Sequence, residues 1–286
     1  MQLLEQRRSP VKTAPGGMFN FYDLAYSVGL WGSSPYWLIK PSARRKVSRA
    51  LKERMGHVPA RESQSPAIWI HAVSLGEMNA TRALIDELRR ARPELHFIVS
   101  TTTQTGFDRG KQLYGNAEHV KLIRYPLDFT PAVTRTLDAL RPSVVALMEL
   151  EIWPNFVYQC ARRNIPVLIA NGRITQPSYQ KYMWIKPVTS RMLRRVSRVC
   201  VQDDTYATRF LDMGAHPRAV EITGTMKFDT AQLADRVEGD AELARLVGLK
   251  PGREFILVCG STGPGEEEII LTQYHELLAR YGRLRV

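Results

Sequence analysis

The sequence predicts an α/β protein, with a doubly wound parallel sheet in an N-terminal domain and the start of a second Rossmann-like domain. Two observations predict this class: short apolar runs of strand type recur along the chain, and a stretch of helical type follows each one. Strands and helices that alternate at this spacing are typical of a parallel sheet with helices on its faces. The 286 residues have room for one large domain or two modest ones.

Six strands are expected, each followed by a helix. The strands are placed at Ala67–Val73, His96–Ser100, Val120–Tyr125, Val144–Met148, Pro166–Ala170 and Arg198–Gln202. The helices are placed at Glu77–Arg92, Thr105–Leu113, Thr130–Leu140, Pro154–Arg163, Tyr179–Arg195 and Asp203–Met213. After a Lys-Pro-Gly turn signal, a further strand is expected at Glu254–Cys259 and a further helix at Glu266–Arg280.

Changes in composition predict four segments. Residues 1–17 are polar, as in a flexible tail, and residues 18–56 join an apolar stretch to a basic one. Residues 57–230 hold the regular alternation of strands and helices and are expected to form the N-terminal domain. Residues 231–286 read as a linker and an incomplete second domain, because one strand, one helix and the start of another strand cannot bury their apolar faces alone.

The segment 18–56 has the composition of a membrane-associated segment. Its apolar stretch is interrupted by Asp23, two glycines and a Ser-Ser-Pro sequence, so it falls short of the roughly 20 apolar residues of a clean transmembrane helix. An apolar stretch beside a cationic block suits a segment that lies in or dips into an anionic leaflet. The alternative is an amphipathic helix that packs on the domain with a solvated basic face. No cleavage site of small residues follows, which argues against a signal peptide.

The charge balance implies an anionic partner. The chain has 40 basic and 28 acidic residues, a net charge of +12. Nucleic acid is disfavoured as that partner, because the basic residues gather near the apolar stretch and not among aromatic stacking positions. The chain shows no paired cysteine or histidine motif, so neither a disulfide framework nor a built-in metal site is expected. The cysteines are Cys160, Cys200 and Cys259.

The loops that follow the strands are the places to look for a site, because ligands of open α/β sheets bind beyond the carboxyl ends of the strands. The first such loop reads HAVSLGE, from residue 71 to residue 77. Ser74 and Glu77 have the spacing of a capping box, in which both side chains cap the helix that follows. Alternatively, Gly76 lets a substrate approach the backbone and Glu77 is a general base. Spacing alone leaves both interpretations open.

Two further loops carry polar groups that suit a sugar or a phosphate. The loop from Ser100 to Gly106 offers several hydroxyls, including that of Thr103, although helix capping explains one of them equally well. After the fourth strand, Glu149 and Glu151 would point to one face if the strand persisted. These acids could orient sugar hydroxyls, or they could merely favour a helix N-terminus.

Cations follow two later strands, and a glycine-rich turn opens the second domain. Arg173 and Lys227 are suited to a carboxylate or phosphate, although either is equally well a surface charge. Ser261 and Thr262 lie in the turn GSTGPG before a helix. This turn is not a Walker motif, but its N–H groups suit a nucleotide phosphate.

Taken in order, these loops resemble the motifs of the Kdo (3-deoxy-D-manno-octulosonic acid) transferases. The matching strings are HAVSLGE, STTTQTG, YPLD, MELEIWPN, IANGRIT and GTMKFD, spread over about residues 71 to 229. The string GSTGPGEEE resembles the start of that family's second domain, and the N-terminal segment is similar to its membrane anchor. Gly172 and Gly263 stand where the family usually carries an alanine and a histidine.

The resemblance implies an inverting, two-domain glycosyltransferase of the GT-B type that needs no metal or other cofactor. Its donor would be CMP-Kdo and its acceptor a lipid A precursor, at the cytoplasmic face of the bacterial inner membrane, in lipopolysaccharide biosynthesis. Residues 57–230 would be the acceptor-side domain and residues 231–286 part of the donor-side domain. The basic charge agrees with this, because donor, acceptor and membrane surface are all anionic.

The resemblance also assigns roles to the residues of the loops. Glu77 would be the general base that deprotonates the acceptor hydroxyl. The residues that would position the acceptor or donor are Glu149, Glu151, Ser74, Gly76 and Thr103. The residues that would bind the carboxylate and phosphate of the donor are Arg173, Lys227, Ser261 and Thr262.

Two alternatives come from other functional classes. A chain with the acceptor groove but only part of the second domain fits a membrane-docked, non-catalytic binding protein, and as a truncated transferase it would show little or no activity. A nucleotide-sugar epimerase of the same fold is a further alternative, which the membrane-associated segment disfavours.

Overall fold

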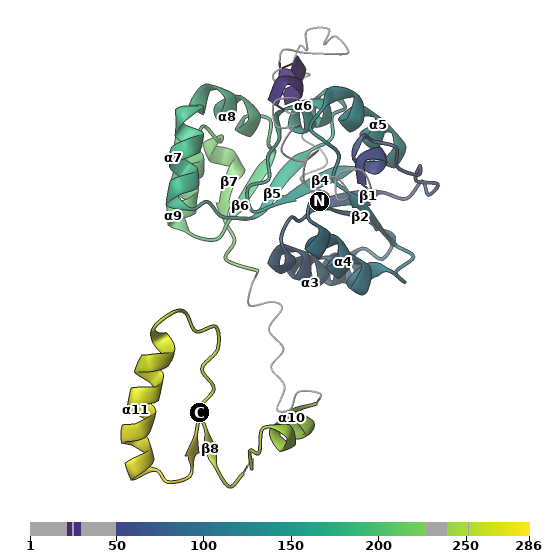
Figure 1. Cartoon of the computed structure of the whole chain (residues 1–286). Coiled ribbons are helices and arrows are strands. Elements are labelled where there is room, and N and C mark those ends of the chain that lie inside the picture. The colour runs from purple at the N-terminus through teal and green to yellow at the C-terminus, as the bar shows by residue number, and fades with distance from the viewer. Residues whose placement is uncertain (1–21, 25, 30–49, 227–238, 251) are drawn as a thin grey trace. The chain divides into compact units, whose positions relative to one another are not determined.

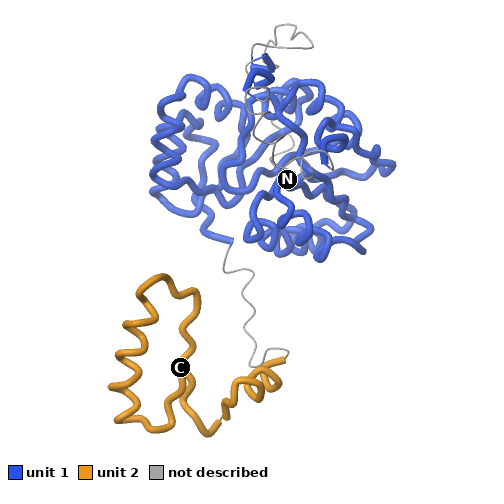
Figure 2. Tube along the Cα trace, in the orientation of Figure 1, with its two compact units in different colours: residues 1–231 blue, residues 232–286 orange. Residues whose placement is uncertain are grey.

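The computed structural model describes residues 22–24, 26–29, 50–226, 239–250 and 252–286 (Figure 1). The expected tail and most of the expected membrane-associated segment therefore lie outside the described residues. The chain divides into two compact units, unit 1 of residues 1–231 and unit 2 of residues 232–286 (Figure 2).

Unit 1 is built on a seven-stranded, wholly parallel sheet with the strand order β3-β2-β1-β4-β5-β6-β7. The strands are β1 (Ala67–His71), β2 (His96–Thr101), β3 (Val120–Arg124), β4 (Val144–Met148), β5 (Val167–Gly172), β6 (Arg198–Val201) and β7 (Val220–Ile222). The six strands placed from the sequence are all present, and the predicted α/β class is confirmed.

Helices cover both faces of this sheet. The helices α3 and α4 lie on one face, and α5 and α6 lie on the other (Figure 1). The helices of unit 1 from residue 50 onward include α3 (Leu75–Ala91), α4 (Gln104–Tyr114), α5 (Thr130–Leu140), α6 (Pro154–Arg162), α7 (Gln176–Trp184), α8 (Lys186–Leu193), α9 (Asp204–Asp212) and the 3₁₀ turn η1 (Pro217–Ala219).

One helix expected from the sequence is two helices in the structure. The single helix placed at Tyr179–Arg195 is wrong, because the chain breaks at Ile185 between α7 and α8. Pro187 lies in the first turn of α8. A proline has no backbone N–H to bond the preceding turn, and its ring clashes with the carbonyl four residues earlier, so α7 cannot continue through it.

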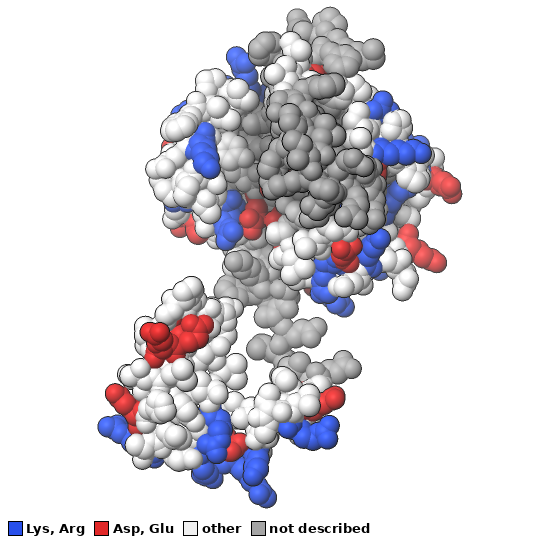
Figure 3. All heavy atoms as spheres, viewed as in Figure 1, with Lys and Arg blue, Asp and Glu red and all other residues white. Residues whose placement is uncertain are grey.

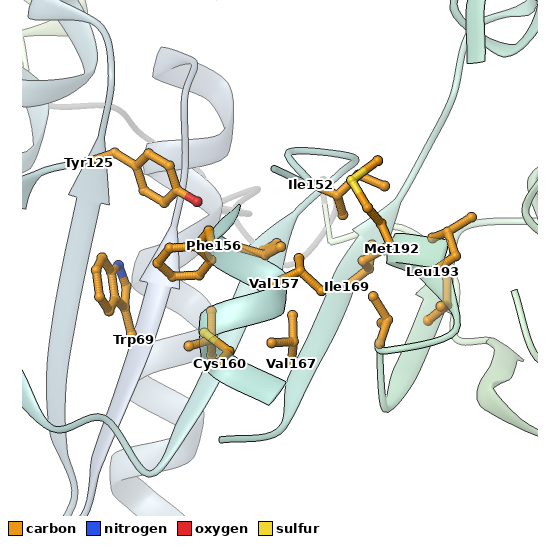
Figure 4. Packing of buried hydrophobic residues seen from close by; sticks show 14 of the residues in the cluster. Trp69, Tyr125, Ile152, Phe156, Val157, Cys160, Val167, Ile169, Met192 and Leu193 are labelled. Carbon is orange, nitrogen blue, oxygen red and sulfur yellow. The ribbon is translucent and has the colours of Figure 1, made fainter. Parts of the chain in front are cut away.

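The core on the α5–α6 face is held by interlocked aromatic rings (Figure 4). The ring of Phe156 packs against Trp69 with centroids 5.1 Å apart and against Tyr125 with centroids 5.0 Å apart. The same cluster runs on to Met192 and Leu193 of α8. Because closely packed side chains in a core move little, this cluster holds the ends of β1 and β4, and the loops that follow them, in fixed positions.

The N-terminus of α5 is capped by a residue far away in sequence. Its own N-cap position is Phe129, which has no side-chain oxygen. Asp23, fully buried in a short helical segment, accepts a hydrogen bond from the Thr130 N–H at 2.9 Å and another from the Asn155 side-chain amide at 2.7 Å. Asp23 thereby joins the start of α5 to the start of α6.

The N-terminus of α6 is capped in a similar way. Its N-cap position is Trp153, and Asp128 accepts hydrogen bonds from the Asn155 N–H at 3.1 Å and the Phe156 N–H at 2.8 Å. Burial raises the pKa of Asp128 to about 6, while those two N–H groups act to lower it.

The described part of the expected membrane-associated segment packs on unit 1. Besides Asp23, Ala50 is buried, and Glu53 accepts a hydrogen bond from the Arg124 N–H at 2.7 Å. Across the described ranges, no helix is both long and apolar enough to cross a membrane. The contact of this segment with a membrane stays a prediction.

Unit 2 is a strand–helix–strand motif preceded by the short helix α10 (Asp240–Leu246). The strands β8 (Phe255–Ile256) and β9 (Leu284–Arg285) pair in parallel, with α11 (Glu266–Arg280) between them. The expected strand at Glu254–Cys259 is therefore only two residues long. None of the described residues of unit 2 is buried, so this motif has no core of its own.

The cap that Asp23 supplies predicts a stability effect. Replacing Asp23 by alanine removes two buried hydrogen bonds to a carboxylate, so we expect a loss of about 1–3 kcal/mol in the free energy of unfolding. Asp23→Asn keeps an acceptor oxygen and should lose less. The neighbouring Leu24 is 61% exposed, so Leu24→Ala is the matched control. Urea denaturation followed by circular dichroism measures all three, and an Asp23→Ala variant as stable as the control would contradict the capping role.

Candidate functional site

The strand order places two motif-bearing loops side by side. After β3 the chain crosses back over the sheet to β4, which pairs with β1 on the side opposite β2. The loops that follow β1 and β4 therefore leave the same edge of the sheet as neighbours, at the topological switch point where open α/β sheets bind their ligands.

Glu77 forms the capping box expected from the sequence. One of its carboxylate oxygens accepts the Ser74 N–H at 3.1 Å and the other accepts the Val73 N–H at 3.0 Å, while the Ser74 hydroxyl accepts the Glu77 N–H at 3.1 Å. The residue is 9% exposed. The capping interpretation is thus confirmed, and the role of Glu77 as a base stays a prediction.

Gly76 leaves the surface above this loop open. A Cβ atom at Gly76 would meet one neighbour within 4 Å, the Ser74 hydroxyl at 3.9 Å. Ser74, Leu75 and Gly76 are all exposed, although Leu75 is apolar. The backbone here is therefore accessible to a molecule lying over the start of α3.

Thr103, in the loop that follows β2, supports the loop that follows β1. It caps α4 by accepting the Gly106 N–H at 3.1 Å, and its hydroxyl donates to the Val73 carbonyl at 2.7 Å. A Cβ atom at Gly106 would lie 2.5 Å from the hydroxyl of Thr101 and 3.0 Å from the Val73 carbonyl, so only glycine allows this approach. Thr103 holds the Val73–Glu77 turn in place, which fits the capping alternative.

A cavity of about 190 Å³ opens beside the loop that follows β4. Its lining combines carboxylates, a guanidinium and hydroxyls, as expected for a site that binds a polar ligand. The lining residues are Glu149, Leu150, Glu151, Arg173, Ile174, Thr175, Ser178 and Tyr182. Complete small-molecule sites usually measure about 300–1,000 Å³, so this cavity has room for one sugar-sized group and not for a whole nucleotide sugar.

Glu149 and Arg173 meet across this cavity. The strand β4 ends at Met148, and Glu149 adopts a left-handed backbone conformation with φ +54°, so the extended strand on which the sequence argument depended does not persist. Glu149 and Glu151 nevertheless line the same cavity. The Arg173 guanidinium lies 3.7 Å from the Glu149 carboxylate, a long ion pair between half-buried groups.

Glu151 is shifted towards its protonated form. Its pKa is raised from 4.5 to about 7, chiefly by burial and then by the nearby carboxylates of Glu77 and Glu149. A weak interaction with the Trp153 indole N–H, outside normal hydrogen-bond geometry, acts in the opposite direction. The Glu77 carboxylate of the first loop is thus near enough to raise the pKa of Glu151 in the third, as a neighbouring like charge does.

The histidine of the first loop is a core residue. The His71 ring stacks on Tyr125 with centroids 3.9 Å apart, and its Nδ1 lies 3.0 Å from the Ser100 hydroxyl. Complete burial lowers its pKa to about 3, so the ring is neutral. We therefore assign His71 to packing and not to acid–base chemistry.

The predicted donor-binding residues fall in different parts of the chain. Arg173 lines the cavity, and Lys227 lies outside the described residues. Ser261 and Thr262 are exposed in the turn of unit 2, where Ser261 has φ +60°. The Gly263 N–H of that turn already donates to Glu266 at 2.7 Å, so a phosphate would compete with this carboxylate. Glu266 belongs to the cluster of acidic residues at the start of α11 (Figure 3).

Sequence reasoning missed three hydroxyl residues of the cavity: Thr175, Ser178 and Tyr182. The Thr175 hydroxyl donates to Ser178 at 3.1 Å, and burial followed by the Glu151 charge raises the pKa of Tyr182. The sequence did indicate these three residues. They are spaced by three and four positions, so they share one face of a helix, and that helix directly follows the IANGRIT string.

Metal ligands are not grouped in the described ranges. There, no three His, Cys, Asp or Glu side chains are arranged so that they could hold a metal ion. The expectation that no cofactor is needed stays a prediction.

Comparison with known proteins connects these loops to one family. Residues 49–230 match the family described as 3-deoxy-D-manno-octulosonic-acid transferase (kdotransferase). The chain is 34% identical over 241 residues to 3-deoxy-D-manno-octulosonic acid transferase of Haemophilus influenzae, covering 84% of this chain and 55% of that protein. For the Bordetella pertussis protein of that name, identity is 31% over 217 residues, covering 72% and 50%. The chain thus spans about half the length of these curated relatives.

Solved structures support the fold. The UDP-GlcNAc 2-epimerase from Neisseria meningitidis bound to UDP-GlcNAc aligns with a TM-score of 0.53 at 14% identity, covering 76% of this chain and 63% of that one. The corresponding epimerase from Methanocaldococcus jannaschii gives 0.50 at 12% identity, covering 77% and 65%. At such identities the likeness confirms the predicted GT-B type of α/β fold and carries no activity with it. The family match spans the whole sheet and its motif-bearing loops, and the chain therefore belongs to the 3-deoxy-D-manno-octulosonic-acid transferase family of glycosyltransferases.

Proposed function

We propose that this chain forms the acceptor-side half of an inverting Kdo transferase in lipopolysaccharide biosynthesis. The donor is CMP-Kdo, the acceptor is a lipid A precursor at the cytoplasmic face of the inner membrane, and no metal takes part. The observation that carries the proposal is the position of Glu77, and of the cavity lined by Glu149 and Glu151, at the switch point of a sheet whose loops match the family.

Glu77 is proposed as the general base. Each of its oxygens accepts one backbone N–H, and a carboxylate offers about four lone-pair sites, so both oxygens can accept a further proton donor. The acceptor hydroxyl gives its proton to Glu77 as its oxygen forms a bond to the anomeric carbon of Kdo. The bond from that carbon to the phosphate oxygen breaks, and CMP leaves with the electron pair. Attack opposite the leaving group inverts the configuration.

Glu151 is proposed as a hydrogen-bond donor to the sugar. With a pKa of about 7, it holds a proton for much of the time near neutral pH. A protonated carboxyl can donate where its ionised neighbour can only accept, so the two acids would have separate roles.

Arg173 is proposed to receive an anionic group of the donor. Its ion pair with Glu149 is long, at 3.7 Å, and partly solvated, so it contributes little energy and can exchange for a better-placed carboxylate or phosphate. An incoming anion would then displace Glu149 towards the sugar hydroxyls.

The base assignment predicts that Glu77→Gln lowers the rate of Kdo transfer by about 10²–10⁴-fold, because glutamine cannot accept the proton. Glutamine can still occupy this position of a capping box, so the fold should persist. The measurement is the rate of Kdo transfer from CMP-Kdo to a lipid A precursor. It uses the whole protein that the gene encodes.

The control for this experiment loses a helix cap elsewhere. Asp203 caps α9 by accepting the Tyr206 N–H at 2.9 Å and lies outside the cavity lining. Asp203→Ala should cost about 1 kcal/mol of stability and leave transfer unchanged. Near-normal transfer by Glu77→Gln would disprove the base assignment, whatever the control does.

The raised pKa of Glu151 predicts a pH-dependent stability. Because the native pKa of about 7 exceeds the ordinary 4.5, the native state binds more protons than the unfolded state between these values, and stability falls as pH rises through this window. Glu151→Gln removes the penalty. We expect the variant to be about 1–3 kcal/mol more stable than wild type at a pH of about 8.

At pH 4.5, the ordinary glutamate value, the difference should nearly vanish. Urea denaturation at both pH values measures it. A gap between variant and wild type that is equal at the two pH values would mean that Glu151 has an ordinary pKa in the folded protein.

A further inference from the structure

The junction of α7 and α8 exposes apolar side chains at a corner of unit 1. Trp184 is 87% exposed, and Ile185 and Val188 are 50% and 43% exposed. Single exposed apolar residues are ordinary on protein surfaces, but three within five positions form a patch. We call residues 176–195 the α7–α8 corner; Figure 1 shows it at the side of the sheet that carries β6 and β7.

The corner is held firmly in place. On its inner side, Met192 and Leu193 belong to the core cluster (Figure 4). The buried Thr189 donates its hydroxyl to the Tyr182 carbonyl at 3.2 Å and lies 3.3 Å from the Ile185 carbonyl, which ties α8 to the end of α7. The exposed side chains are therefore displayed by packed helices and not by a loose loop.

The corner is also cationic throughout. Its twenty residues include five basic side chains and no aspartate or glutamate. Among the described residues, none of the five forms an ion pair with an acid. The basic residues are Lys181, Lys186, Arg191, Arg194 and Arg195. By contrast, three cations on and beside α3 are each paired with a nearby carboxylate.

We propose that the α7–α8 corner docks on an anionic phospholipid surface, with Trp184 and Ile185 entering the headgroup boundary and the basic side chains facing lipid phosphates. Tryptophan prefers the membrane–water interface, and cations beside an apolar patch add attraction to anionic lipid. A second copy of the chain is a poorer occupant, because a symmetric contact would set each cationic corner against its twin.

The position of the corner fits an acceptor that stays in the membrane. Ser178 and Tyr182 of α7 line the cavity with Glu151, and Trp184 follows Tyr182 by two residues. A lipid whose sugar occupied the cavity would need a bilayer close by. This part of the argument rests on the proposed function, whereas the exposure and charge of the corner do not.

Vesicle sedimentation of the full chain tests the docking surface. The vesicles contain phosphatidylethanolamine and phosphatidylglycerol, or phosphatidylcholine alone, with neither donor nor acceptor present. The test variant changes Lys181, Lys186 and Arg191 to glutamine. Each cation near an anionic surface is worth about fivefold in binding, so we expect binding to the anionic vesicles to weaken about a hundredfold.

The matched control removes three cations of α3 and its C-terminal end, in the variant Arg82→Gln, Arg90→Gln, Arg92→Gln. Both triple variants lower the net charge of +12 by the same amount, so a response to overall charge alone would affect them equally. We expect the control to bind within about twofold of wild type, because exposed charges beyond a Debye length of the surface are screened.

The apolar part of the docking surface has its own pair of variants. Trp184→Ala should weaken vesicle binding about tenfold or more, whereas Leu211→Ala, at a 40% exposed apolar residue of α9, should not change it. Brominated lipid should quench the tryptophan fluorescence of the wild type more than that of Trp184→Phe. Quenching requires the indole of Trp184 to enter the bilayer.

Corner variants that bind anionic vesicles as wild type does would overturn the proposal. So would corner variants that change self-association in sedimentation velocity and leave vesicle binding intact, since that outcome would identify a second copy as the occupant. Because these assays contain no sugar donor, they stand apart from the transfer reaction. If Glu77→Gln loses Kdo transfer and still binds vesicles normally, the docking proposal stands independently of the transfer reaction.

Discussion

The site depends on how the free N–H groups at the starts of the helices are satisfied. In a parallel sheet, several helices begin at the edge where the strands end, and each start leaves backbone N–H groups that need partners. Here side chains supply the partners: Glu77 with Ser74 at α3, Thr103 at α4, Asp23 at α5 and Asp128 at α6. The same edge is where ligands of such sheets bind.

This constraint explains why the motifs of the loops allowed two readings. A carboxylate or hydroxyl that satisfies a helix start is also a group that can hold a sugar or accept a proton. Capping and binding therefore draw on the same residue types at the same spacing, and no pattern in one sequence separates them. Glu77 shows this most clearly, since its cap is present in the structure and its oxygens retain room for another donor.

The regular parts of unit 1 were predictable because they follow from local patterns. Buried parallel strands are continuous apolar runs, so the six strands could be placed within about two residues of their ends. The break at Pro187 was also readable from sequence, because a proline removes a helix hydrogen bond and its ring clashes with the turn before it. Trp184, just before the break, is 87% exposed.

Contacts between distant residues could not be predicted in this way. Asp23 meets Asn155 across 132 positions, and nothing local to either residue indicates it. Likewise, Glu149 has a left-handed backbone at the point where β4 ends beside β5. Glu149 and Glu151 therefore line one cavity although they do not lie in an extended strand, so the alternation of side chains along a strand does not explain it. Glu149, Glu151 and Arg173 could be named as cavity residues because they lie in consecutive loops of one sheet edge. Thr175, Ser178 and Tyr182, which sequence reasoning missed, lie further along the chain at and beyond the start of α7.

A chain of contacts connects Asp23 to the loop beside the cavity. Asp23 bonds Asn155, which follows Glu151 by four residues, and Asp128 bonds the same asparagine through its backbone. The loop that carries Glu151 is therefore anchored on one side by a residue of the segment expected near the membrane. On its other side it lines the cavity together with α7, the first helix of the α7–α8 corner. If the segment that contains Asp23 and the α7–α8 corner both contact a bilayer, as we propose for the corner, the loop that carries Glu151 is held between two contacts with one surface.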